Sequence, residues 1–239
     1  MAPRTAKPAT RPHLKTHRIE RAGRACLTNA RRLLEDAQQL EDFGSPSTAC
    51  YLSAIAQEEV AKSFLLALVV RDVVPWDKKL LPVLSDHRCK QLLCVVMDFL
   101  SPDLEAFVES CNAVVLRNEL PRMPPAVADA LNILRYEKIG RWASKSWCWA
   151  EDPEYDRDAL AIANGRQERV KQAYIYVDIG ADGSATALPT MLTVEEAQTE
   201  RERAGRLLAL AERLLDGDAA PGLDFDLVRE AFRILFAQA

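Results

Sequence analysis

The stretch from Thr48 to Val74 constrains the fold most strongly, because it is long, largely apolar and spaced for a single helix. At 3.6 residues per turn, one stripe of this helix carries Leu52, Ile55, Ala56, Ser63, Leu66, Val70 and Val73. Glu59 falls on that same stripe, and Lys62 lies about one turn away. A carboxylate on a packing face is costly to bury unless it is paired and hydrogen-bonded. The helix therefore predicts either a structural partner or a chemical role for Glu59.

The composition predicts a mainly helical globular protein. Of the 239 residues, 49% are hydrophobic and 28% are charged, and there are nine glycines. The helix formers Ala, Leu, Glu and Arg dominate. No apolar signal region opens the chain, and the most apolar run, from Phe64 to Val70, is too short to span a bilayer. We expect a cytoplasmic protein with no membrane-crossing segment.

Charge and cysteine usage limit the kinds of partner. Residues 1–24 carry seven Arg and Lys side chains against Glu20 alone, although the net charge of the chain is −4. This basic segment could contact a polyanion, but a solvated tail leading into a helix with an Arg-rich outer face is the simpler interpretation. The six cysteines show no CxxC spacing, which favours reduced, buried thiols. We predict no metal site and no cofactor.

Gly and Pro residues divide the chain into predicted helices. Their expected ranges are 15–42, 48–74, 85–100, 104–116, 126–139, 159–173, 194–215 and a last helix from 224 or 226 to 236. The segment 174–178 alternates β-forming residues and predicts a strand, with a possible return strand at 184–188. A lone two-stranded hairpin is marginal in water, so we expect this one to rest on the helical body.

These elements suggest one helical domain with two appended parts. Residues 1–14 are predicted to form a disordered basic tail, residues 15–140 a helical bundle, and residues 141–239 a carboxy-terminal extension packed on the bundle. The extension would contain a Trp-rich loop, a helix, the β-hairpin and two further helices. Aromatic residues beside Arg141 and Lys145 could stack on bases, but packing onto the helices is the commoner outcome.

The best candidate site combines the long helix with the start of the helix near residue 86. His87 and Lys90 are three residues apart and project from the same side of their helix. If the helices pack antiparallel, they could meet Glu58, Glu59 and Lys62. Carboxylate, imidazole and ammonium groups form an acid/base and anion-stabilising set, in which His87 titrates near neutral pH. The structural alternative is a salt-bridge cluster that fixes the register of the helices.

Ribonuclease-like chemistry would suit these groups. His87 would move a proton at the 2′-hydroxyl or at the leaving oxygen, while Lys90 or Lys62 would stabilise the charge that develops on the phosphate.

Four segments in a fixed order carry a family resemblance: NARRLLEDAQQL, ACYLSAIAQEEVAKSFLL, SDHRCKQLL and QAYIYVDIGADGSATALPTMLTVEEA. Together they resemble the AbiV-type abortive-infection family, a branch of the HEPN helical superfamily, over roughly residues 29–197. The most specific pieces are the Ala-Ile-x-x-Glu-Glu-x-x-Lys stretch at 54–62, the pair His87 and Lys90, and the Tyr-Val-Asp strand that precedes a Thr-x-Glu-Glu helix start. Glu59 and Lys62 are further positions that match the family.

The resemblance implies a mainly α fold, a HEPN-like helical bundle with a small β-hairpin and a helical C-terminal extension. It also implies a cytoplasmic, toxin-like phage-defence protein, often a homodimer, that cleaves RNA or interferes with translation. Many HEPN ribonucleases carry an Arg-x4–6-His motif. The nearest match here is Arg117-Asn118, and no His follows at the required spacing.

Two functions are therefore expected from the resemblance and the residues together. The first is abortive infection through metal-independent RNA cleavage, with Glu58, Glu59, Lys62, His87 and Lys90 as the catalytic set. The alternative is a non-catalytic defence protein that binds a phage protein or a component of the translation machinery.

Overall fold

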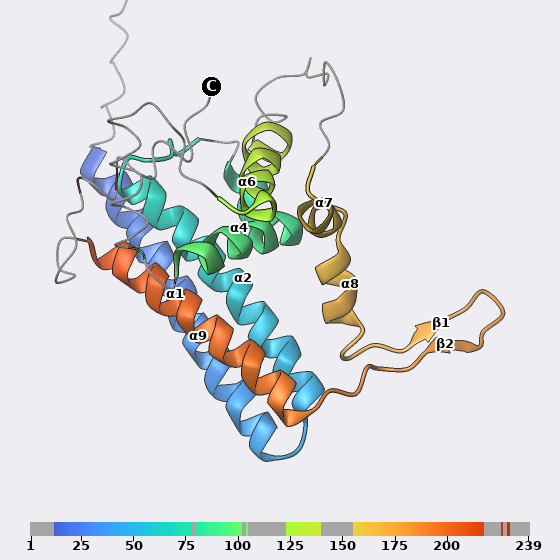
Figure 1. Cartoon of the computed structure of the whole chain (residues 1–239). Coiled ribbons are helices and arrows are strands. Elements are labelled where there is room, and N and C mark those ends of the chain that lie inside the picture. The colour runs from blue at the N-terminus through green and yellow to red at the C-terminus, as the bar shows by residue number, and fades with distance from the viewer. Residues whose placement is uncertain are drawn as a thin grey trace, which may run out of the picture.

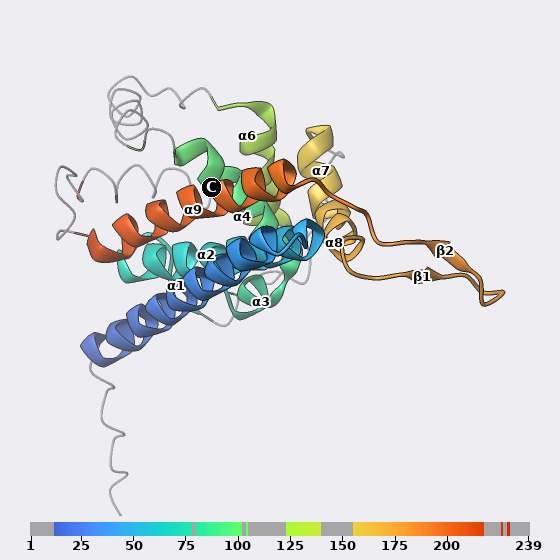
Figure 2. The same cartoon turned by 90° about the horizontal axis from the view of Figure 1, so that it is seen from below.

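Three long helices form the body of the molecule (Figures 1 and 2). They are α1 (Pro12–Asp42), α2 (Pro46–Val70) and α9 (Val194–Asp216), and each of them packs against the other two. The structure is a computed structural model that describes residues 12–77, 80–101, 104, 123–139, 155–217, 226 and 229. The dominance of helices over these residues confirms the predicted mainly α fold.

The remaining helices cover α2 where α1 and α9 leave it open. Helix α4 (His87–Leu100) crosses α2 and packs on α6 (Pro125–Asn132), while α3 (Leu80–Ser85) precedes it. The π-helix η1 (Ile133–Ile139) continues α6. Helix α7 (Arg157–Ala163) packs against α4 and α6, and α8 (Arg166–Gln172) follows it. Helix α8 contacts both α2 and α4, so these three helices meet at one place.

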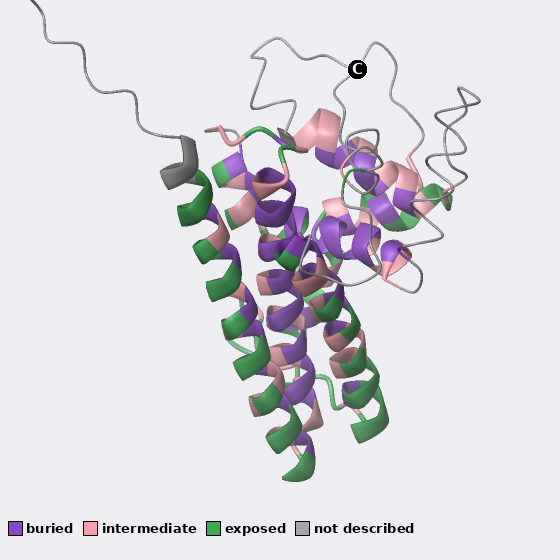
Figure 3. Ribbon diagram, turned by 90° about the vertical axis from the view of Figure 1, so that its left-hand side faces the viewer, coloured by how far each residue is buried: buried purple, intermediate pink, exposed green. Residues whose placement is uncertain are grey.

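Helix α2 is the buried centre of the fold. Its residues are buried along most of its length, as the ribbon coloured by burial shows (Figure 3). A helix that is apolar on all sides belongs in a protein interior. Val60, Phe64, Leu65 and Leu68 are among its almost fully buried side chains. Because neighbours surround α2, the polar residues in its middle turns also face protein rather than open solvent.

The end of α2 is tied to the end of α9. Helix α2 stops at Val70, four residues before its predicted end, and Asp72 turns the chain with a φ of 56°. The Arg71 guanidinium donates hydrogen bonds to the carbonyl oxygens of Leu214 and Leu215 at 3.2 and 3.0 Å. These carbonyls lie in the last turn of α9, where no intrahelical donor is available. Arg71 therefore provides hydrogen-bond donors for the carbonyl groups at the C-terminal end of α9.

Local signals predicted the ends of α9 correctly. Thr193 accepts a hydrogen bond from the backbone N–H of Glu196, and the Glu196 carboxylate accepts one from the backbone N–H of Thr193. This reciprocal pair is a capping box, and it forms at the Thr-x-Glu-Glu helix start seen in the sequence. Gly217 follows the last helical residue with a φ of 61°, as expected for a helix stop.

Several predicted elements differ from the observed ones. The helix predicted over 159–173 is two short helices, because the chain turns at Asn164 and at Gly165, whose φ is 82°. The segment 80–85 forms α3, since Pro82 lies in its first turn, where a missing N–H costs little. Three predicted segments lie outside the described residues, apart from single positions. They are the helix at 104–116, the last helix, which ends at 236, and the Trp-rich loop.

The β-hairpin does not rest on the helical body, contrary to expectation. Strands β1 (Asp178–Ile179) and β2 (Ala185–Ala187) pair antiparallel, and all their residues are exposed. The hairpin projects away from the bundle as a thin arm (Figures 1 and 2). The expected strand from residue 174 is shortened because residues 173–175 form a turn after α8.

Across the described residues, no helix combines the length and the apolar character needed to cross a bilayer.

Candidate functional site

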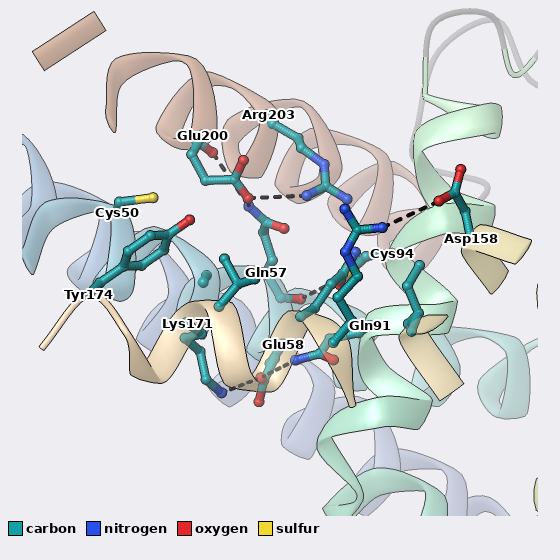
Figure 4. A pocket seen from close by; sticks show the side chains of 15 residues that line it. Cys50, Gln57, Glu58, Gln91, Cys94, Asp158, Lys171, Tyr174, Glu200 and Arg203 are labelled. Atoms are coloured by element: carbon teal, nitrogen blue, oxygen red, sulfur yellow. Dashed lines mark hydrogen bonds and ion pairs between the residues drawn. The ribbon is translucent and has the colours of Figure 1, made fainter. Parts of the chain in front are cut away.

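Glu58 is the point at which α2, α4 and α8 meet. Its Oε1 accepts a hydrogen bond from Lys171 Nζ at 2.7 Å. Its Oε2 lies 2.8 Å from Lys90 Nζ and 2.5 Å from His87 Nδ1. Figure 4 shows Glu58 with Lys171 on one side and Gln91 on the other. Three cationic or titratable side chains from two other helices therefore converge on one carboxylate.

A second carboxylate completes the group. Glu168 Oε2 lies 2.6 Å from Lys171 Nζ and 3.8 Å from His87 Nδ1. We call Glu58, His87, Lys90, Glu168 and Lys171 the Glu58 cluster. With two carboxylates and two ammonium groups, its formal charge is zero when His87 is neutral, so the local charge is balanced despite the burial.

Burial differs sharply within the Glu58 cluster. The side chains of Glu58, Lys90 and Lys171 are 5, 7 and 4% exposed, whereas that of His87 is 49% exposed. Burial acts to raise the pKa of Glu58, but hydrogen bonds from Lys171 and Lys90 outweigh it, and the pKa lies below its ordinary value. Burial acts to lower the pKa of Lys171, but Glu168 and Glu58 raise it above its ordinary value. The charges of Glu58 and Lys171 are therefore both stabilised by their ion-pair partners.

These pKa shifts predict a window of maximum stability. The Glu58 carboxyl titrates lower in the folded protein than its unfolded value of about 4.3, so its stabilisation is complete above that pH and is lost as the pH falls through the folded pKa. Lys171 titrates higher than its unfolded value of about 10.4, so its contribution is complete below that pH and is lost as the pH rises further. Urea unfolding of wild type and Glu58→Gln across pH should show a shallower acid-side loss in the variant. Identical acid slopes would contradict the assignment.

His87 is positioned by the start of α4. The Asp86 carboxylate caps the helix by accepting a hydrogen bond from the Arg88 backbone N–H at 2.8 Å, which makes His87 the first residue of α4. Its Nδ1 is 2.5 Å from Glu58 and 3.5 Å from Lys90 Nζ. The shorter contact, to a carboxylate, requires a proton on Nδ1, because Glu58 can only accept. In a neutral ring, Nε2 is then the basic nitrogen, and among the described residues it has no partner.

The structure separates the predicted site residues into two groups. Glu58, His87 and Lys90 come together, whereas Glu59 pairs with Lys62 at 2.6 Å. The prediction that Glu59 meets His87 and Lys90 is wrong. Consecutive helical residues point about 100° apart, so burial of Glu58 toward α4 turns Glu59 away. The Glu59 and Lys62 side chains are 18 and 25% exposed, which places this pair nearer to solvent than Glu58.

Sequence reasoning missed the α8 members of the cluster. Lys171 is 113 residues from Glu58 along the chain. The only local signal is that Glu168 and Lys171 are three residues apart, a spacing that brings two side chains together on one helix face. That signal predicts a salt bridge, but it does not reveal that both residues face α2.

A pocket of about 400 Å³ adjoins the Glu58 cluster. Residues from α2, α4, α7, α8 and α9 line it, together with Tyr174 (Figure 4). Glu58, Gln91 and Lys171 belong to its wall, so the buried carboxylate borders the pocket. Its volume lies within the range of small-molecule sites.

A metal ion fits the cluster poorly. Glu58, His87 and Glu168 present ligand atoms within 4.8 Å of one another. However, Glu58 already holds two ammonium groups and Glu168 holds one, at 2.6 to 2.8 Å. A divalent cation would have to displace buried lysines from both carboxylates and leave those lysines unpaired. The lysines supply the positive charge that these carboxylates need.

The long helices and the flanking short helices form a mainly α bundle with the polar site at their junction. Residues 18–209 match the family model HEPN_AbiV, described as AbiV, and the chain belongs to this family. The match confirms the resemblance found in the sequence and supports an abortive-infection role in phage defence. No curated protein and no solved structure matches the chain.

Proposed function

We propose that this protein acts in the cytoplasm in abortive infection, and that the Glu58 cluster cleaves RNA without a metal ion. The proposal rests on the position of the His87 ring and on the contact that its Nδ1 makes. A buried carboxylate fixes its Nδ1 at 2.5 Å, and its half-exposed ring offers Nε2 to a ligand. A carboxylate that orients an imidazole in this way prepares the other nitrogen to accept a proton.

A purely structural cluster would not require the histidine. Lys90 and Lys171 already place ammonium groups at 2.8 and 2.7 Å from the two oxygens of Glu58. His87 adds a third donor whose ring stays half exposed, and it therefore contributes little buried area. Its placement is better explained by proton transfer than by packing.

The proposed reaction needs one proton acceptor and local positive charge. His87 Nε2 takes the proton of a ribose 2′-hydroxyl, and the freed oxygen attacks the adjacent phosphorus. A 2′,3′-cyclic phosphate forms, the bond to the 5′-oxygen breaks, and the imidazolium returns its proton to that leaving oxygen. Lys90, with Nζ 3.5 Å from the ring, keeps positive charge beside the phosphate. This scheme does not use the Arg-x4–6-His motif.

This chemistry predicts a defined product and a defined inert substrate. Purified protein should cleave a single-stranded RNA oligonucleotide in the presence of EDTA and leave 2′,3′-cyclic phosphate ends. A matched oligonucleotide with a single deoxyribose at the cleaved position should stay intact there, because it lacks the attacking oxygen. Cleavage that stops in EDTA, or that continues at the deoxyribose, would contradict the proposal.

The second candidate is non-catalytic binding of a phage protein or of a translation component. The projecting hairpin favours it, because Tyr176, Ile179, Leu188 and Met191 are large apolar side chains left exposed on or beside the arm. The same arm could join two copies as a homodimer. If the protein cleaves no RNA and substitutions on the arm abolish phage protection, this candidate replaces the first.

A further inference from the structure

Helix α8 is held on the bundle by charge rather than by apolar packing. All seven residues from Arg166 to Gln172 are described, and Lys171 is the one buried side chain among them. None of the seven belongs to the apolar core. Helix α7, which has the same length, buries Ala159 and Ile162 in that core. The docking of α8 therefore depends on Lys171, whereas α7 is anchored by apolar contacts.

The ion pair between Lys171 and Glu58 can open without leaving a bare charge. Lys171 Nζ lies 2.7 Å from Glu58 and 2.6 Å from Glu168, which is on the same helix. If α8 moves away, Lys171 keeps Glu168 as its partner. Glu58 keeps Lys90, whose Nζ is 2.8 Å from its Oε2. The largest penalty for breaking a buried pair, an uncompensated charge, is therefore avoided on both sides.

The chain on either side of α8 allows such a movement. Gly165 forms the turn between α7 and α8 with a φ of 82°, a conformation in which glycine is favoured. Tyr174, two residues after α8, packs against the second apolar cluster, which contains Ala49 and Cys50. Helix α8 is thus a short polar segment between two anchored ends. Segments with few buried apolar contacts open most easily.

Helix α8 also forms one wall of the pocket (Figure 4). Arg166, Gln167, Val170 and Lys171 line the pocket from α8, and Glu58 and Cys94 line it from α2 and α4. A movement of α8 away from the bundle would open this wall. The same movement would take Glu168 and Lys171 out of the Glu58 cluster and leave Glu58, His87 and Lys90 in place.

We propose that α8 is a latch over the pocket, which opens when Lys171 separates from Glu58. Opening exposes the pocket wall on α4, and closing restores the full Glu58 cluster. The latch itself is independent of the reaction. Its consequence for RNA cleavage rests on the proposed function, because the Glu58 cluster is complete only while α8 is docked.

Two cysteines of α4 report the opening. Cys89 and Cys94 are both 2% exposed, and burial raises the pKa of both thiols to about 12. Only Cys94 is a lining residue of the pocket. In Lys171→Ala, iodoacetamide should alkylate Cys94 at least about tenfold faster than in wild type, while Cys89 stays at its wild-type rate. Peptide mass spectrometry measures both rates. An unchanged Cys94, or an equal rise at both cysteines, would overturn the proposal.

A valine substitution on the same helix tests whether the latch is polar. Val170 is 44% exposed and also lines the pocket. Val170→Ala shortens an apolar side chain of α8 and leaves every ion pair in place, so Cys94 should react as in wild type. Acceleration equal to that of Lys171→Ala would show that apolar contacts hold α8, contrary to the proposal.

Two matched glycine substitutions test the latch with the Glu58 cluster chemically intact. An added Cβ at Gly165 meets only ordinary contacts, at 3.7 and 3.8 Å, but its positive φ is strained for alanine. Gly165→Ala should accelerate alkylation of Cys94 about 5- to 30-fold, if opening relieves that strain. Gly183 has a φ of 81° in the hairpin turn, and Gly183→Ala should leave Cys94 unchanged. Equal rates in these two variants would overturn the hinge.

The latch and the proposed function can fail separately, because alkylation requires no RNA. Accelerated labelling of Cys94 in a protein that cleaves no RNA would leave the latch standing and remove the proposed function. RNA cleavage by wild type, together with unchanged labelling in both Lys171→Ala and Gly165→Ala, would remove the latch alone.

Discussion

Glu58→Gln is expected to lower the free energy of unfolding by about 3–5 kcal/mol, the usual cost of breaking a buried ion pair by removing one partner. The substitution keeps the shape of the side chain and removes its charge. Among the described residues, Lys171 would then keep only Glu168 as an ion-pair partner, and Lys90, also almost fully buried, would lose its ion pair. Urea denaturation at neutral pH measures the change.

The adjacent residue provides a matched control. Glu59→Gln is the same chemical change one position along α2, in a pair with Lys62 that is partly exposed. Such pairs contribute about 0–1 kcal/mol. If the two variants lose equal stability, the distinction between the buried Glu58 and its neighbour is wrong. A double substitution with Lys171→Met should cost less than the sum of the single changes, because the two side chains interact directly.

His87→Asn is expected to reduce the rate constant of RNA cleavage at least 100-fold, which is the usual contribution of a general acid/base. Asn retains polarity but has no group that titrates near neutral pH. Because the His87 side chain is half exposed, and Lys90 and Lys171 still pair with Glu58, the free energy of unfolding should change by less than about 1 kcal/mol. Single-turnover cleavage and urea denaturation of the same preparation separate the two effects.

His17→Asn is the control for that experiment. His17 is an exposed residue of α1, on a different helix from the Glu58 cluster. It should cleave RNA at the wild-type rate. Equal loss in both variants would point to a general effect on the protein. Full activity of His87→Asn would show that His87 is not the proton acceptor.

The sequence predicts the fold well wherever the signals are local. The Thr-x-Glu-Glu helix start depends on neighbouring residues alone, and the helix predicted over 194–215 appears in the structure as α9, Val194–Asp216. Errors arise where a turn interrupts a helical pattern. Gly165 divides the segment 159–173, because its left-handed backbone supports a turn that the apolar spacing does not reveal.

The candidate site could be predicted only in part, for a geometric reason. His87 and Lys90 share one helix face, and the polar cluster on α2 is visible as an exception in an apolar run. The choice between Glu58 and Glu59 depends on how α2 is rotated against α4, which the spacing leaves open because α2 is apolar on all sides. Lys171 depends on the docking of α8, more than 100 residues away.

Protection against phage by wild type, His87→Asn and His17→Asn, expressed at equal levels, tests the central claim most directly. The claim is that the defence function of this AbiV-family protein is exerted through the Glu58 cluster. Plaque formation should be restored to the level of unprotected cells by His87→Asn and should stay suppressed by His17→Asn. Full protection by His87→Asn would contradict the account.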